Sequence, residues 1–127
     1  MAIVWRLEDK NGVGMYMNCK LNRAYELAGN FNCNDPSRHP SPMFDNKLGF
    51  DHIHPAEQDN YFFGFASLSQ MKQWVYIPEV RRQLSLLGIL LVKYNVPREY
   101  YRRSPFQVVF RREWATKVSS RAPDYND

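Results

Sequence analysis

Cysteine is scarce in this chain of 127 residues, which contains only Cys19 and Cys33. Because no secretion signal is visible, the two cysteines favour free thiols over a disulfide bridge. Long apolar runs are also absent. The longest extends from Leu84 to Val92 and is interrupted by Ser85 and Gly88, so it falls short of the ~20 residues that span a bilayer. The composition therefore excludes a disulfide scaffold and predicts a cytoplasmic protein without a membrane partner.

Sequence signatures of nucleotide, metal and hydrolase sites are missing as well. The chain has no phosphate loop, no G-x-G-x-x-G, no H-E-x-x-H and no G-x-S-x-G. His52 and His54 follow Asp51 on one extended stretch. Zinc ligands usually come as closely spaced pairs, so we predict no metal site. Function must be inferred from charge, from polar residues on apolar segments and from resemblance.

The net charge of +4 is unevenly distributed. Residues 1–80 carry 7 Lys or Arg against 9 Asp or Glu, whereas residues 81–127 carry 10 against 4. A basic half favours an acidic partner, which can be a nucleic acid, a phosphorylated cofactor or an acidic protein. The alternative is a basic face that contacts only solvent.

Apolar periodicity predicts an α+β fold. Asn11-Gly12 indicates a tight hairpin turn, and Ser67 with Gln70 forms a capping box that begins a helix. The predicted strands cover residues 2–7, 13–17, 61–65, 89–96 and 106–110, and the predicted helices cover residues 20–28, 67–75 and 78–88. We expect one domain over residues 1–116, with a small, mixed, mostly antiparallel sheet, two to three short helices and a loosely held polar tail over residues 117–127.

Residues 29–59 show no apolar period, which leaves a functional loop or a plain surface excursion. His39 and Ser41 lie in the segment that contains Pro40 and Pro42. The two prolines limit the conformational freedom of this segment, so both polar side chains would be held in place for a ligand. As a nucleophile and base the pair lacks an identifiable third residue.

Arg6 and Glu8 are charged residues on an apolar strand, and their spacing of two places them on the same face. A buried arginine needs a partner because an unpaired charge in a core is costly. The partner is either Glu8 or an anionic ligand such as a phosphate. In the remaining alternative, Arg6 lies on an edge strand and reaches water.

The C-terminal half interleaves aromatic residues with arginines. Tyrosine and arginine dominate binding hot spots, and aromatic rings beside arginines also suit single-stranded nucleic acid. The alternative is that the rings pack inward from a basic hairpin. The candidate partner-binding residues are Tyr100, Tyr101, Arg102, Arg103, Arg111 and Arg112.

The sequence resembles small bacteriophage proteins that share a series of short motifs. These are an R-x-E strand, a G-x-G hairpin, an H-P-x-P loop, F-G-F-x-S-L-x-Q and a final Q-V-V-F strand. In this chain they are Arg6–Glu8, Gly12–Gly14, His39–Pro42, Phe63–Gln70 and Gln107–Phe110. The resemblance covers most of the chain and implies a phage protein without implying a chemistry.

The order of elements is also similar to that of the smaller ADP-ribosyltransferase-like folds. This resemblance implies that Arg6 contacts NAD, that the Phe63–Ser67 segment builds the nicotinamide side, and that Gln107 stands where the family has a catalytic Glu. A neutral amide cannot supply the negative charge that stabilises a cationic transition state. Glu8 or Glu57 would have to supply that charge, so activity is in doubt.

We therefore expect a phage accessory protein that binds and modulates or inhibits a host component, such as a defence protein, on an ADP-ribosyltransferase-like scaffold. An active NAD-dependent ADP-ribosyltransferase and a nucleic-acid-binding protein are the alternatives. Whether the chain is an enzyme stays open. If it is, the expected catalytic residues are Gln107 and Glu8, and the expected NAD-binding residues are Arg6, His39, Ser41, Phe63 and Phe65.

Overall fold

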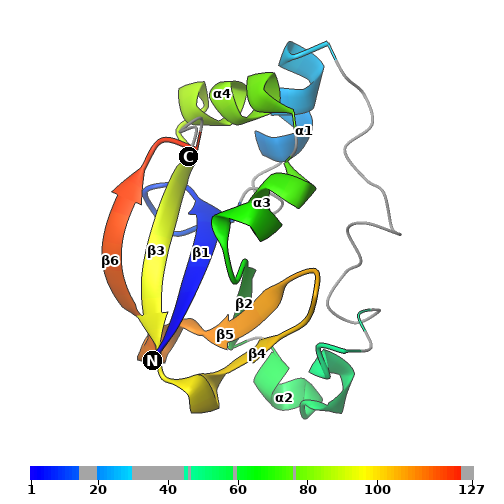
Figure 1. Ribbon diagram of the computed structural model, residues 1–127, viewed down its shortest axis with the longest axis vertical. Coiled ribbons are helices and arrows are strands. Elements are labelled where there is room, and N and C mark those ends of the chain that lie inside the picture. The colour runs from blue at the N-terminus through cyan, green and yellow to red at the C-terminus, as the bar shows by residue number, and fades with distance from the viewer. Residues whose placement is uncertain (15–19, 30–44, 46, 59, 76, 124–127) are drawn as a thin grey trace.

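The computed structural model describes residues 1–14, 20–29, 45, 47–58, 60–75 and 77–123, and Figure 1 shows their arrangement. The strands are β1 (Ala2–Glu8), β2 (Tyr61–Gly64), β3 (Leu90–Val96), β4 (Tyr101–Arg103), β5 (Val108–Arg111) and β6 (Thr116–Arg121). The α-helices are α1 (Lys20–Leu27), α2 (Pro55–Gln58), α3 (Leu68–Trp74) and α4 (Pro78–Leu86). Short 3-10 turns are η2 (Phe50–His52), η3 (Arg98–Tyr100) and η4 (Arg112–Trp114).

The described strands form two three-stranded sheets, β1-β3-β6 and β2-β5-β4, in which every pair is antiparallel. A single bridge joins them, with the amide nitrogens of Trp5 and Phe65 donating to each other's carbonyl oxygens at 2.8 and 2.6 Å. The strands therefore follow the spatial order β6-β3-β1-β2-β5-β4. The α+β class is confirmed, whereas the single mixed sheet expected from the sequence is divided into two.

Local sequence signals explain where the helices begin and end. Pro78 occupies the first turn of α4, and Gly88 follows that helix with φ of 87°, as expected of a glycine that ends a helix. Ser67 caps α3 by accepting the Gln70 amide at 3.0 Å. The Gln70 side chain does not return to Ser67, as a full capping box requires. It accepts the Ala66 amide at 2.8 Å instead.

Two hydrophobic cores lie on the sheets. The first is enclosed by α1, α3 and α4, and Figure 1 shows α1 and α4 at one end of the molecule and α3 nearer its middle. The second lies between β1, β3 and β5. The first core contains Leu7, Leu21, Ala24, Phe65, Met71, Trp74, Val75, Val80, Leu84, Ile89 and Leu91. The second contains Val4, Val92, Tyr94, Val96, Val108 and Phe110. β1 contributes to both cores, because successive side chains of a strand point to opposite faces.

One expectation needs correction. Residues 117–121 belong to β6 and pair with β3, so they do not form a loosely held tail. Both faces of β6 are mostly exposed. Its sequence therefore does not show the alternation of apolar and polar residues by which a half-buried strand is recognised. Arg81 on α4 is also buried and donates to the Val75 carbonyl at 2.6 Å. Burial lowers the pKa of this guanidinium.

Gly64 permits the close approach of β1 and β2. A Cβ at this position would lie 2.6 Å from the Trp5 carbonyl oxygen and 2.8 Å from Cγ1 of Val4. The first of these atoms is backbone, so it cannot move without shifting β1. The junction of the two sheets therefore requires a residue without a side chain at position 64.

Replacing Gly64 with Ala should lower the free energy of unfolding by about 3 kcal/mol, because overpacking here displaces a strand. Urea titration followed by circular dichroism measures the loss. Gly29→Asn is the control, since Gly29 has φ of 79° and nothing within 4 Å of an added Cβ, and asparagine tolerates that conformation. The control should lose less than about 1 kcal/mol. Equal losses would contradict the steric role of Gly64.

Candidate functional site

Arg6 lies on β1 and is almost completely buried, with 5% of its surface exposed. One terminal nitrogen, Nη1, donates to the Phe63 carbonyl oxygen of β2 at 2.7 Å. Its Nε lies 3.7 Å from Oε1 of Glu8. The guanidinium carbon is 5.2 Å from the centre of the Phe62 ring and 6.0 Å from that of Phe63. Of the alternatives left open by the sequence, the structural ion pair with Glu8 is the one observed.

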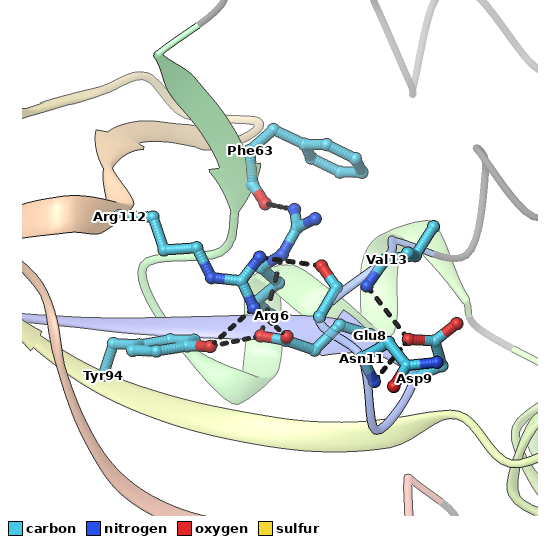
Figure 2. A network of polar contacts seen from close by, with 9 residues as sticks. Arg6, Glu8, Asp9, Asn11, Val13, Phe63, Tyr94 and Arg112 are labelled. Atoms are coloured by element: carbon cyan, nitrogen blue, oxygen red, sulfur yellow. Dashed lines mark hydrogen bonds and ion pairs between the residues drawn. The ribbon is translucent and has the colours of Figure 1, made fainter.

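Glu8 is the centre of a buried polar network, shown in Figure 2, and only 1% of it is exposed. One oxygen, Oε1, accepts the Tyr94 hydroxyl of β3, and the other accepts Nη2 of Arg112. The same Arg112 nitrogen lies 3.2 Å from the Tyr94 hydroxyl, and Nη1 donates to the Gly12 carbonyl at 2.8 Å. One carboxylate therefore lies against two guanidinium groups from distant parts of the chain.

The hairpin after β1 covers this network. Asp9 Oδ1 accepts the amides of Asn11 at 2.8 Å and Val13 at 3.0 Å, as Figure 2 shows. A Cβ on Gly12 would lie 2.2 Å from Nη2 of Arg112, and a Cβ on Gly14 would lie 2.9 Å from Nη2 of Arg6. The two glycines thus leave the space that the two guanidinium groups occupy.

Burial and charge act in opposite directions within the network. Burial lowers the pKa of Arg6, and the neighbouring Arg112 lowers it further, whereas the Glu8 carboxylate raises it. Burial is also the main cause of the raised pKa of Tyr94, and the hydrogen bond to Glu8 adds to it. Tyr94 therefore stays a neutral donor to Glu8 at physiological pH.

Gln107 lies in a second buried polar cluster. It is fully buried, and its side-chain nitrogen donates to Oδ2 of Asp45 at 3.2 Å. The Ser104 hydroxyl donates to the same carboxylate oxygen and accepts a hydrogen bond from the backbone amide of Gln107 at 3.2 Å. The Ser104 carbonyl accepts Nε2 of Gln70 at 3.1 Å, which connects the cluster to α3.

The structure therefore brings together some of the expected catalytic and NAD-binding residues and separates others. Arg6, Glu8 and the Phe63 carbonyl are in contact. Within the described residues, no hydrogen bond or ion pair joins them to the Gln107 cluster. Phe65 is buried in the first core beside Trp74, with ring centres 5.8 Å apart. His39 and Ser41 lie outside the described residues.

Sequence reasoning did not single out Tyr94 or Ser104 for these clusters. Tyr94 has the spacing of an apolar strand residue. One available signal is that a buried Arg6–Glu8 pair leaves carboxylate lone pairs that need further donors. Arg112, assigned to a partner surface, is one of those donors.

The tyrosines of the basic segment are anchored inward. Tyr100 and Tyr101 are half-buried and pack against the second core. Tyr100 also stacks on Trp114, with ring centres 4.8 Å apart and ring planes 7° apart. Trp114 is 50% exposed, so it presents an aromatic surface that the sequence reasoning did not single out.

The arginines of the basic segment fall into two groups. Arg112 is held by Glu8, and Arg111 pairs with Glu113. Arg98, Arg102 and Arg103 are exposed, and the described part of the chain gives none of the three an ion-pair partner. The unpaired arginines of this segment therefore lie on η3 and β4.

A solvent-open hollow of about 230 Å³ lies beside this charge. It is formed where the start of β1 meets η3, β4 and the residue before the Ser67 cap. Its lining comprises Met1, Ala2, Ile3, Ala66, Arg98, Tyr101 and Arg103. The hollow combines two guanidinium groups with a phenol and aliphatic side chains, which suits a small anion attached to an apolar group.

Comparison with known proteins places the chain in a family. A profile described as Bacteriophage T4 Y00F protein matches residues 1–124. The chain belongs to this bacteriophage T4 Y00F family. No curated protein and no solved structure matches it.

The resemblance to small phage proteins is thereby confirmed, and the similarity to ADP-ribosyltransferases receives no support from the comparisons. Among the described residues of this Y00F family member, none of the helices is long and apolar enough to cross a membrane. The same residues contain no group of three or more His, Cys, Asp or Glu arranged to hold a metal ion.

Replacing Glu8 with Gln should lower the free energy of unfolding by about 3 kcal/mol, because the buried Arg6 and the half-buried Arg112 lose their counter-charge. Adding Arg112→Met should restore part of that loss by removing one of the uncompensated charges. The exposed Glu57→Gln serves as a control and should change stability by less than about 0.5 kcal/mol. Chemical denaturation measures all three, and a Glu8→Gln loss no greater than the control would contradict the network.

Tyr94 should make stability sensitive to alkaline pH. Its pKa is raised above the ordinary value of 10.0, so its contribution is complete below about pH 10 and is lost as the pH rises through the folded-state pKa. Tyr94→Phe should lower stability by about 1 kcal/mol at pH 7 and should flatten the decline above pH 10. Urea titrations between pH 7 and 11 test this, and parallel curves for the two proteins would refute it.

Proposed function

We propose that this chain is a phage accessory protein that binds an acidic host protein through η3 and β4 and thereby modulates or inhibits it. One observation carries the proposal: Arg98, Arg102 and Arg103 are exposed and lack ion-pair partners in the described residues, whereas Arg111 and Arg112 are engaged within the fold. Unpaired surface charge steers an oppositely charged partner. The proposed place of action is the host cytoplasm.

The surface has the composition of a binding hot spot. Tyr100 is anchored in the second core and stacked on the half-exposed Trp114. A rigid aromatic side chain loses little conformational entropy on binding, and tryptophan, tyrosine and arginine are enriched among the residues that dominate interfaces. The aromatic pair and the free arginines together support contact with a protein.

Nucleic acid is a weaker candidate for the same surface. Tyr100 and Tyr101 pack inward, which removes two of the rings that would stack on bases. Two of the six expected arginine and tyrosine contacts, Arg111 and Arg112, are held by Glu113 and Glu8. Nonspecific nucleic-acid binding depends on neutralising many phosphates, and η3 and β4 supply three unpaired arginines for that purpose.

One contact favours a second candidate function, NAD-dependent ADP-ribosylation. Asp45 lies 3.2 Å from the Gln107 side-chain nitrogen, so a carboxylate adjoins the amide that stands where ADP-ribosyltransferase-like folds have a catalytic Glu. Both residues are nearly solvent-free, which places this candidate second. Labelled NAD incubated with host extract tests it. Transfer that is lost in Asp45→Asn would support this candidate. The absence of both transfer and NAD cleavage would eliminate it.

The double variant Arg102→Glu/Arg103→Glu should lose at least tenfold in affinity for the host partner, because two attractive charges become repulsive. Tagged protein is expressed in host cells, and a partner recovered in stoichiometric amount after nuclease treatment is identified by mass spectrometry. Binding of that purified partner to both proteins is then measured by calorimetry.

Arg23→Glu/Arg82→Glu is the matched control, since it makes the same change in net charge on α1 and α4, at the opposite end of the molecule from β4 (Figure 1). It should bind within about twofold of the parent, although each substitution breaks an exposed helix pair worth about 0.5 kcal/mol. Equal retention of the partner by both double variants, or recovery of no stoichiometric partner, would overturn the proposed function.

A further inference from the structure

The hollow beside β4 is a defined feature of the basic surface. Arg98 and Arg103 line it from η3 and β4, Tyr101 lies between them in sequence, and Ile3 and Ala66 supply aliphatic surface. Arg102 is not part of the lining, as expected from the alternation of side chains along β4. A Cβ on Gly49 would lie 3.0 Å from Nη1 of Arg102, so Arg102 lies beside Gly49.

The size of the hollow restricts what it can hold. Pockets for drug-sized ligands and cofactors enclose roughly 300–1,000 Å³, and this one encloses about 230 Å³. Since a water occupies roughly 30 Å³ of liquid, the space corresponds to roughly eight waters, which is the scale of one large side chain. A dinucleotide is too large to be enclosed here.

The charge of the hollow favours phosphate over carboxylate. Two guanidinium groups without described ion-pair partners supply two positive charges. A carboxylate carries one negative charge, whereas a phosphate monoester carries about −1.5 to −2 at pH 7 and offers three acceptor oxygens. Arginine binds phosphate through parallel hydrogen bonds, and Tyr101 is part of the same lining. The aliphatic residues can cover the carbon atoms that carry the phosphate.

We propose that this hollow binds the phosphate monoester of a phosphorylated side chain on the protein partner. The inference rests on the proposed function for its setting, because it specifies which chemical group of an acidic partner is recognised. The hollow would bind one phosphorylated residue of the partner. Arg102, Trp114 and their neighbours would contact the partner's surface around that residue.

Phenyl phosphate is the test ligand, and its binding is followed by amide chemical shifts in the full chain. Saturable shifts should appear at Ala2, Ile3, Ala66 and Tyr101 at millimolar concentrations. Arg98→Gln/Arg103→Gln should weaken binding at least tenfold. Arg102→Gln, which removes a neighbouring charge outside the lining, should bind within about twofold of the parent. Shifts that are equally strong in the double variant, or that never saturate, would overturn the proposal.

Three further ligands distinguish the sources of the anion. Benzoate, which has the ring and a single charge, should bind at least fivefold more weakly than phenyl phosphate, and equal affinity would overturn phosphate selectivity. Inorganic phosphate should also bind more weakly, since it lacks the ring. A 5′-phosphorylated oligonucleotide that bound more tightly than phenyl phosphate would assign the hollow to nucleic acid and overturn the side-chain proposal.

These results are separable from those for the proposed function. Capture of a host partner that depends on Arg102 and Arg103, without binding of phenyl phosphate at the hollow, overturns only this inference. Binding at the hollow without a stoichiometric host partner overturns only the proposed function.

Discussion

The Glu8 carboxylate is the point on which the two sheets depend. It lies on β1, accepts hydrogen bonds from Tyr94 on β3 and from Arg112 after β5, and pairs with Arg6, which in turn donates to β2. A single buried charge thus connects strands of both sheets. Burying a charge without partners is costly. Moving any strand or turn that carries a donor to Glu8 would leave the buried carboxylate short of a partner, so these elements are held in place.

This arrangement divides the basic residues of the C-terminal half by role. Arg81 and Arg112 satisfy a carbonyl and a carboxylate inside the fold, and Arg111 is paired at its edge. The net positive charge of the sequence therefore overstates the charge that a partner meets. Three arginines that remain unpaired lie on η3 and β4, beside a hollow sized for one chemical group. A focused charge of this kind suits recognition of a particular acidic site better than binding along a polyanion.

Much of the fold could be predicted from local pattern, and much of the site could not. Helix α4 was predictable because Pro78 and Gly88 mark its ends, and β3 because its apolar run has the length of a central strand. Strand β6 is mostly exposed on both faces and leaves no apolar period. The role of Arg112 depends on its contact with Glu8, which lies 104 positions away in the sequence. The role of Asp45 depends on its contact with Gln107, which lies 62 positions away. Such contacts follow from topology, which periodicity does not encode.

The motifs shared with small phage proteins have structural reasons in this fold. R-x-E supplies the buried ion pair, and G-x-G leaves room for Arg6 and Arg112. In F-G-F-x-S-L-x-Q, Gly64 lets the sheets meet, Ser67 caps α3, and Gln70 connects α3 to the chain before β5. Q-V-V-F places Val108 and Phe110 in the second core.

A chain with this fold needs those residues whatever it binds. The motifs that lie in described residues therefore identify the scaffold. The residues that we propose to contact a partner, Arg98, Arg102, Arg103 and Trp114, all lie outside the motifs. Variation in function within such a scaffold is expected at η3, β4 and η4, where side chains can change without disturbing either the Glu8 network or the junction at Gly64.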